Sequence, residues 1–495
     1  MTGAAPPAGP APATPAPPRP LSLPPILAGI RPRPRWRELR LLAIVAAALL
    51  TGSVSLGATL RARDAEPGLG IPEGAFAPYG TTLLAIYLGA LLAAHIAQVL
   101  AGRRTDQVLL PAVGLLGGMS LLLMERLPQR LAGQFGGLAQ TQLVWLLIAI
   151  GILTTLSIVV RSDSWLRLYK YTWAAAGVGL LLLTFVLGRD VNGARLTLEL
   201  GPISGQPSEL LKVILVVFLA GYLSENRALL VEQSTRVGPF RLPPLPYIAP
   251  MVAMWAIALG IVVIQRDLGA ALLFFAVFLL LLYIATARWS YVVYGLAAFI
   301  AGGALMYAIV GHVQDRVDIW IDPFADPRGK GYQVVMALYA FARGGILGTG
   351  LGNGLPTVGG GQPGGIPEIH TDFPLAALGE ELGLIGILAI LGLYFVVIER
   401  GLRIAASAAD EFRSLLAAGL SLVVGVQAFI IAAGNLKLIP LTGITLPFIS
   451  YGGSSLLANS LAVGLLLALS DRGVEPPPPP RSGRRLARLL DRGAP

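Results

Sequence analysis

The sequence predicts an all-α polytopic membrane protein, and three observations carry this prediction. Its 495 residues are 55% hydrophobic and only 13% charged, with a mean hydropathy of +0.71, a composition typical of a chain whose solvent is lipid. Apolar runs of roughly 18 to 25 residues recur along the chain, each long enough to cross a hydrocarbon core of about 30 Å as a helix. Arginine and lysine gather in every second loop, as expected of cytoplasmic loops.

Twelve membrane-spanning helices are expected from these apolar runs. We place them at residues 41–60, 80–101, 107–124, 142–160, 168–188, 207–224, 247–264, 268–287, 290–311, 374–398, 415–436 and 446–469. The basic flanks put both termini in the cytoplasm and the first span in the role of an uncleaved signal. The largest loop, residues 312–373, then lies outside the membrane, before the tenth span.

The two ends of the chain and its overall charge have simple explanations. Residues 1–40 are rich in proline and alanine and basic, and residues 471–495 include VEPPPPPRSGRR, so both are expected to be disordered cytoplasmic extensions. The formal charge of +10 comes from arginines in short flanks and tails. Membrane topology explains them better than a nucleic-acid partner, which we do not expect. The absence of cysteine excludes disulfides and thiolate metal sites.

The stretch NGARLTLELGPISGQPSELLK joins the fifth and sixth spans. Pro207 and Ser208 should open a helix, on which Glu209 and Lys212 lie three residues apart on one face. A capped helix with a partly buried ion pair accounts for this pattern. The functional alternative is the floor of a polar cavity, with Arg195 and Lys212 offered to phosphate groups. The spacing from Ser208 to Lys212 does not match the S-x-x-K signature of serine acyltransferases.

Two other outer segments are charged but ambiguous. Arg266 and Asp267 occupy a tight turn between the seventh and eighth spans, where topology alone would explain them. The run DRVDIWIDPFADPRGK suits an interfacial loop at the headgroups, and it lacks the order of acidic residues of an EF-hand.

The stretch IPEIHTDFPLAALGEELG leads from the large outer loop into the tenth span. Thr371 or Asp372 could cap the helix that begins at Pro374. Alternatively, Asp372 faces the outer membrane surface near His370 and Arg343, which suits acid–base chemistry on a lipid-anchored substrate. Glu380 and Glu381, deeper in the same helix, need inward-facing partners and are expected to be structural. The last span starts in a segment broken by proline and glycine, LKLIPLTGITLPFISYGGSS, which carries one basic residue, Lys437.

Taken together, NGAR…GPISGQPSELLK, QRDLGAALL, GKGYQ…GGILGTGLG, IPEIHTDFPLAALGEELG and LIPLTGITLPFISYGGSS resemble the SEDS family of shape, elongation, division and sporulation proteins, of the RodA, FtsW and SpoVE type. The resemblance implies a ten-helix glycosyltransferase core at 106–470, with two additional N-terminal helices at 41–101. It also implies a bacterial plasma-membrane enzyme, more similar to the elongation-type than to the division-type members, that polymerises lipid II into peptidoglycan glycan strands. A class B penicillin-binding protein would be its transpeptidase partner.

The resemblance also assigns roles to single residues. Asp372 matches the position of the catalytic aspartate, the general base of an inverting transfer, and Arg195, Glu209, Lys212 and Asp267 match positions around the central cavity. Arg343, His370 and Lys437 are further candidates for substrate binding. Cations on the departing diphosphate would be arginine and lysine side chains or a divalent ion such as Mg²⁺ or Mn²⁺.

The sequence departs from the family pattern at two positions, and two other functions remain as alternatives to this interpretation. Thr197 stands where the family commonly has tryptophan, and Arg266 stands where it has proline. A lipid II flippase would also explain many spans around a polar cavity, although no inverted repeat is evident. A scaffold of the cell-wall synthesis complex that has lost catalysis is the remaining alternative.

Overall fold

The computed structural model describes residues 32–64, 79–127, 135–191, 194–200, 203–232, 235–237, 240–242, 252–253, 256, 260, 263, 267–354 and 365–471. Its helices are α1 (Trp36–Asp64), α2 (Tyr79–Ala101), α3 (Leu109–Arg126), α4 (Leu138–Val159), α5 (Ser164–Leu168), α6 (Lys170–Leu187), α7 (Pro207–Glu232), α9 (Leu268–Thr286), α10 (Trp289–Ile309), α11 (Gly311–Ile321), α12 (Tyr332–Gly344), α13 (Pro374–Ala406), α14 (Glu411–Asn435) and α15 (Gly453–Leu469), with a 3₁₀ turn η2 at Pro323–Ala325.

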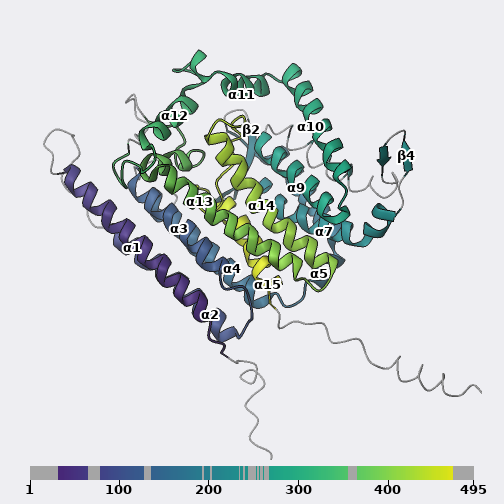
Figure 1. Ribbon diagram of the computed structural model, residues 1–495, viewed down its shortest axis with the longest axis horizontal. Coiled ribbons are helices and arrows are strands. Elements are labelled where there is room, and N and C mark those ends of the chain that lie inside the picture. Colours follow the sequence, from purple (N-terminus) through teal and green to yellow (C-terminus); the bar gives the residue numbers. More distant parts are fainter. Residues whose placement is uncertain are drawn as a thin grey trace, which may run out of the picture.

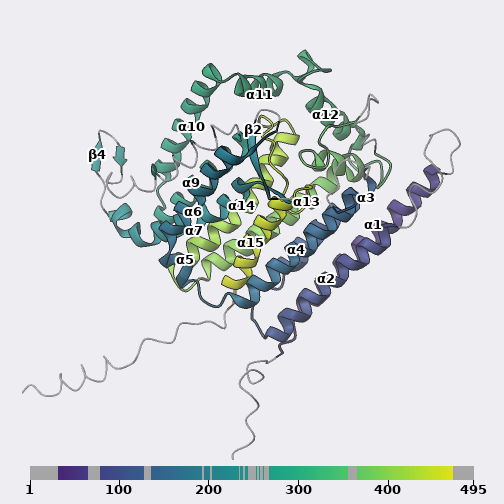
Figure 2. The ribbon, with the colours of Figure 1, turned by 180° about the vertical axis from the view of Figure 1, so that it is seen from behind.

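The predicted fold class is confirmed. Within the described ranges, nine helices are long and apolar enough to cross a membrane, and α6 and the shorter α15 coincide with two more predicted spans. The seventh predicted span, 247–264, lies mostly outside the described residues, so the count of twelve stays a prediction. Figures 1 and 2 show the long helices side by side, with α10, α11 and α12 arching over one end of the bundle.

The centre of the bundle is closely packed because small residues let helices approach. α15 packs on α4, and α14 packs on α7, α9 and α13. A Cβ atom on Gly464 of α15 would lie 3.1 Å from the Leu153 backbone of α4, and one on Gly419 of α14 would lie 2.5 Å from Val216 of α7. Such contacts are typical of helix interfaces in lipid, where close van der Waals packing replaces the hydrophobic effect.

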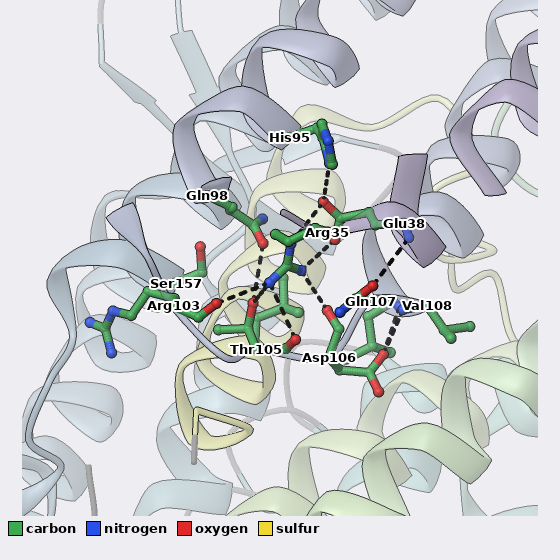
Figure 3. Close-up of polar contacts among 12 residues, drawn as sticks. Arg35, Glu38, His95, Gln98, Arg103, Thr105, Asp106, Gln107, Val108 and Ser157 are labelled. Carbon is green, nitrogen blue, oxygen red and sulfur yellow. Dashed lines mark hydrogen bonds and ion pairs between the residues drawn. The ribbon is translucent and has the colours of Figure 1, made fainter. Parts of the chain in front are cut away.

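The helices α1 and α2 lie along α3 and α4 and are attached to the loop before α3 by buried polar contacts (Figure 3). Arg35 forms an ion pair with Glu38 and donates to the Thr105 hydroxyl at 2.8 Å and the Asp106 carbonyl at 2.9 Å. His95 of α2 lies 2.6 Å from the other oxygen of Glu38. Because these groups are buried, each stays there only by finding partners, and together they fix the register of the added helices.

Two regular elements were not predicted. Residues 189–205 form a three-stranded antiparallel sheet of β1 (Arg189–Val191), β2 (Ala194–Leu200) and β3 (Ile203–Gly205), and residues 235–242 form the hairpin of β4 (Thr235–Val237) and β5 (Phe240–Leu242). The large outer loop is largely helical, since it contains α11, η2 and α12. The alternation of polar and apolar residues in RLTLEL is the local pattern that agrees with strand β2.

Candidate active site

A buried ion pair forms the floor of a polar cavity between α7, α9 and α14. α7 begins at Pro207, as predicted, and Lys212 Nζ donates to Glu209 Oε2 at 2.6 Å. The same ammonium group donates to Gln427 Oε1 at 2.6 Å and to Asn459 Oδ1 at 3.1 Å. Its three N–H donors therefore all have acceptors, and the buried charge is fully compensated.

Asp267 lines the same cavity and caps α9. Its carboxylate accepts from the Ala270 N–H at 3.0 Å, from Ser208 Oγ at 3.2 Å and from Gln206 Nε2 at 3.3 Å. Burial raises the pKa of this carboxyl group, which lies one residue before the span. The cavity, of about 30 Å³, has room for one or two water molecules. Three predicted residues, Glu209, Lys212 and Asp267, are thus brought together here, with Gly443 at their edge.

Asp372 also lies near Gly443, in the turn before α13. A Cβ atom built on Gly443 would lie 3.7 Å from both terminal nitrogens of Arg316 and 3.8 Å from Asp372 Oδ2. Arg316 of α11 and Asp372 are therefore neighbours of the same glycine at the rim of the cavity, and each affects the pKa of the other. The capping alternative for Asp372 is wrong, because the N-cap position of α13 is Phe373 and no side chain caps this first helical turn.

The backbone of the Asp372 turn is held by the segment that leads into α15 and by the end of α14. Three successive carbonyl groups in the turn each accept a hydrogen bond from these two segments. The bonds are Tyr451 N to His370 O at 2.7 Å, Ser450 Oγ to Thr371 O at 2.6 Å and Asn435 Nδ2 to Asp372 O at 2.9 Å. This explains why HTDF and PFISYGGSS occur in one chain: the second segment positions the first.

The surroundings of Asp372 shift the pKa of its carboxyl group toward neutrality. Burial raises the pKa of its carboxyl group to about 6, and the nearby Glu368 carboxylate adds to the rise. Hydrogen bonding by Thr371 and the positive charge of Arg316 act in the opposite direction. Burial lowers the pKa of Arg316, whereas the carboxylates of Asp372 and Asp267 raise it. A carboxylate with a pKa near the working pH is well matched to general-base chemistry.

His370 lies beside this turn. Its ring centroid is 5.5 Å from that of Tyr451, and burial lowers the pKa of the imidazole. Its Nδ1 atom is buried and has no hydrogen-bond partner among the described residues. A buried nitrogen in this position can bind a polar group of a substrate.

The other three predicted residues, Arg343, Lys437 and Arg195, have different surroundings from His370. Arg343 of α12 forms an ion pair with Glu380 at 3.0 Å. Lys437 has a left-handed backbone, with φ of 59°, and donates to the Ile321 carbonyl at 3.3 Å at the end of α11. Arg195 belongs to β2, but its side chain lies outside the described part of the structure, as does the whole of Arg266.

Glu380 and Glu381 both find arginine partners. Glu380 pairs with Arg343, and Glu381 pairs with Arg126 of α3, whose Nη2 also donates to the Gly354 carbonyl at 2.7 Å. These ion pairs tie α13 to α12 and α3. The expectation of structural partners is therefore met by both glutamates.

Sequence reasoning missed the site roles of Arg316, Gln427 and Asn459. Arg316 lies in a loop with many other acidic and basic residues. Nothing in its local pattern indicates that α11 lies against residues 441–443. Gln427 and Asn459 are lone amides in apolar helices. Polar residues in such helices are expensive unless they face partners, and that is the signal that could have found them.

The described residues offer no prepared metal site. Nowhere in these ranges do three or more His, Asp or Glu side chains come together as ligands for an ion. Arg316 carries its positive charge close to both Asp267 and Asp372. Protein ligands for a resident divalent cation do not fit this arrangement.

Comparison with known proteins identifies the family. The model of the FtsW/RodA/SpoVE cell cycle proteins matches residues 106–473. The chain belongs to this family. Peptidoglycan glycosyltransferase RodA of Mycobacterium tuberculosis is 40% identical over 445 residues, covering 89% of this chain and 91% of that protein. A probable peptidoglycan glycosyltransferase FtsW of Nitrosococcus halophilus is 41% identical over 300 residues, covering 59% of this chain and 72% of its own length.

Solved structures share the fold of this chain. One, from work on the coordination of polymerization and crosslinking by a peptidoglycan synthase complex, has 25% identity and a TM-score of 0.59, covering 76% of this chain and 99% of its own. The rod shape determining protein RodA of Thermus thermophilus has 24% identity and a TM-score of 0.52, covering 74% and 97%. With its apolar helices, this member of the family is a multi-pass membrane protein.

Proposed function

We propose that this protein is a peptidoglycan glycosyltransferase that polymerises lipid II, with Asp372 as the general base. One observation carries the catalytic assignment: the Asp372 carboxylate is half-buried, its pKa is raised to about 6, and it shares the surroundings of Gly443 with Arg316 at the rim of a polar cavity. The M. tuberculosis relative, matched over 89% of this chain, is named for this activity. Its longer match compared with that of the FtsW relative supports a role in elongation.

The proposed reaction uses the two charges of the rim differently. The acceptor hydroxyl gives its proton to Asp372, and its oxygen attacks the anomeric carbon of the donor sugar. The bond from that carbon to the diphosphate oxygen breaks on the opposite face, so that configuration is inverted and the electron pair leaves with the lipid diphosphate. Arg316 then stabilises the negative charge that develops on the leaving group.

The buried cavity residues support this reaction indirectly. Lys212 already has three acceptors, so a direct contact with phosphate would break one of its hydrogen bonds. We assign Glu209, Lys212 and Asp267 to positioning: they fix α7, α9 and the segment around Gly443 on which the rim depends. The divalent cation stays a prediction, and no step of this mechanism passes through it.

Purified protein and lipid II in detergent test this proposal. Asp372→Asn, which removes the base but keeps the size, should lower glycan polymer formation by at least about a hundredfold. Asp318→Asn, at an exposed carboxylate of α11, is the matched control and should keep activity. Because detergent solution has no bilayer to cross, polymer formation measures transfer and not transport. Normal polymerisation by Asp372→Asn would refute the assignment of the base.

The remaining proposals concern partner and orientation. The similarity to a protein from a polymerization and crosslinking complex supports a class B penicillin-binding protein as partner, and co-purification of the two proteins from the same membrane tests it. We place both termini in the cytoplasm and Asp372 outside. Protease accessibility of tags at each terminus in inverted and right-side-out vesicles tests this orientation.

A further inference from the structure

A second polar cavity lies at the end of the bundle opposite Asp372. It has a volume of about 900 Å³ and is bordered by the start of α1, the loop from α2 to α3 and the region between α13 and α14. In Figure 1 this end is where α1 begins and α15 ends, whereas α11 lies at the far side. Eight arginines and two aspartates are among the lining residues, so the cavity is strongly basic.

Some of these arginines form its walls. Arg35 pairs with Glu38 and donates to the α2–α3 loop (Figure 3). Arg103 pairs with Asp471 at 2.7 Å. Arg413 pairs with a carboxylate outside the cavity, at 2.6 Å. The carboxylate partners neutralise the charges of these three arginines, and the ion pairs fix the shape of the cavity.

Arg33, Arg37 and Arg104 differ from these wall residues. All three line the cavity, Arg37 and Arg104 are exposed and Arg33 is partly exposed. None of them has a carboxylate within ion-pair distance in the described part of the chain, as the recorded pairs involve other arginines. Three guanidinium groups thus line one cavity without an ion-pair partner among the described residues. Like charges held together in this way favour an anionic ligand.

The adjoining sequence does not supply that anion. Residues 1–31 contain no acidic residue, and residues 472–495 contain Glu475 and Asp491 against six arginines. Both segments therefore carry a net positive charge. An anion for this cavity is more readily supplied by a separate molecule.

The position of the cavity indicates the source. Trp36, between Arg35 and Arg37, begins α1 and is 64% exposed, and tryptophan at the end of a span favours the headgroup level of a bilayer. Arg400 and Arg403 lie in the final turns of α13, where the span formed by that helix ends. We propose that this cavity binds the phosphate of an anionic phospholipid headgroup, held by Arg33, Arg37 and Arg104. Arginine suits this task because its planar fork binds phosphate oxygens in pairs.

Native mass spectrometry of the full-length protein in detergent tests this site. Phosphatidylglycerol is titrated, with phosphatidylcholine in a parallel titration, and bound lipid is counted. The wild-type protein should retain one phosphatidylglycerol in preference to phosphatidylcholine. The variant Arg33→Gln/Arg37→Gln/Arg104→Gln should bind it about tenfold more weakly or worse, with binding of phosphatidylcholine unchanged.

The matched control removes three arginines from the same end of the bundle but outside the cavity: Arg161→Gln/Arg167→Gln/Arg288→Gln. It should bind phosphatidylglycerol as the wild type does. Equal weakening in both variants, or none in the cavity variant, would overturn the proposal. Displacement of the lipid by millimolar inorganic phosphate would also overturn it, by showing that the site takes phosphate from solution. If the triple variant does not fold, the single variants Arg37→Gln and Arg104→Gln, at exposed positions, take its place.

Discussion

Arg316 and Asp372 come from two separate segments, and both side chains lie within 3.8 Å of the position that a Cβ atom on Gly443 would take. The positive charge of Arg316 lowers the pKa of the Asp372 carboxyl group, which burial raises to about 6. A base must be unprotonated, so the polymerisation rate should rise with pH through about 6. Removal of the positive charge in Arg316→Gln should move this limb of the pH–rate profile to higher pH, and Glu368→Gln should move it to lower pH.

The readout for this prediction is the midpoint of the acidic limb, because Arg316→Gln also reduces the rate itself. Arg328→Gln, at an exposed arginine of the same outer loop, should leave the midpoint unchanged. An identical midpoint in wild type, Arg316→Gln and Glu368→Gln would mean that another group titrates.

Gly443→Ala should reduce activity more than it reduces stability. Gly443 has φ of 72°, where an alanine costs roughly 1 kcal/mol, and its new methyl group would contact both the Arg316 guanidinium and the Asp372 carboxylate. Gly345→Ala is the control, since its φ is 52° and a Cβ there meets nothing within 4 Å. Gly345→Ala should be at least as destabilised, because its φ of 52° and ψ of −137° form a conformation that glycine alone adopts readily, and only Gly443→Ala should lose polymerisation. Equal activity of the two would show that the rim tolerates a methyl group.

Lys212→Met should destabilise the protein by about 3–5 kcal/mol, because it leaves Glu209 as an unpaired charge in the interior. The measurement is thermal unfolding in detergent followed by intrinsic tryptophan fluorescence. Lys437→Met removes one hydrogen bond to a backbone carbonyl and should cost about 1 kcal/mol. The double variant Glu209→Gln/Lys212→Met should regain part of the lost stability. If it is no more stable than Lys212→Met, the pairing of these two charges is not what holds α7.

Glu381→Gln should destabilise the protein more than Glu380→Gln does, although the two residues are adjacent. Arg126, the partner of Glu381, has a side chain only 4% exposed, whereas that of Arg343 is 36% exposed. Arg126 would keep a buried charge without its carboxylate, at a cost of about 3–5 kcal/mol, while Arg343 can turn to water at a cost of about 1 kcal/mol. The same melting experiment ranks the two variants, and the reverse order would contradict this account.

Much of the architecture could be predicted because spans depend on local composition. Apolar length gave the helices, and spacing gave the pair of Glu209 and Lys212. The position of Asp372 at the start of α13 also follows from local pattern. The partner of Asp372 does not, since Arg316 is distant in sequence and reaches it only through the course of α10 and α11. Gln427 and Asn459 were missed for the same reason: their importance comes from Lys212, on another helix.

The arch of α10 and α11 gives the two charges of the rim unequal mobility. Asp372 is tied to the interior through α13 and by the backbone bonds from residues 435–451, whereas α10 has Tyr291 as its buried residue and α11 has none. Three hydrogen bonds hold α11 to the segment 437–441. Arg316 donates to the Leu441 carbonyl and Trp320 to the Lys437 carbonyl, and Lys437 Nζ donates to the Ile321 carbonyl at the end of α11. Displacing α11 would therefore break a few polar contacts and leave the apolar interior intact. Asp372 therefore stays in place when a displacement of α11 moves Arg316 away from it. Such a displacement opens a route for a substrate too large to thread into a closed site.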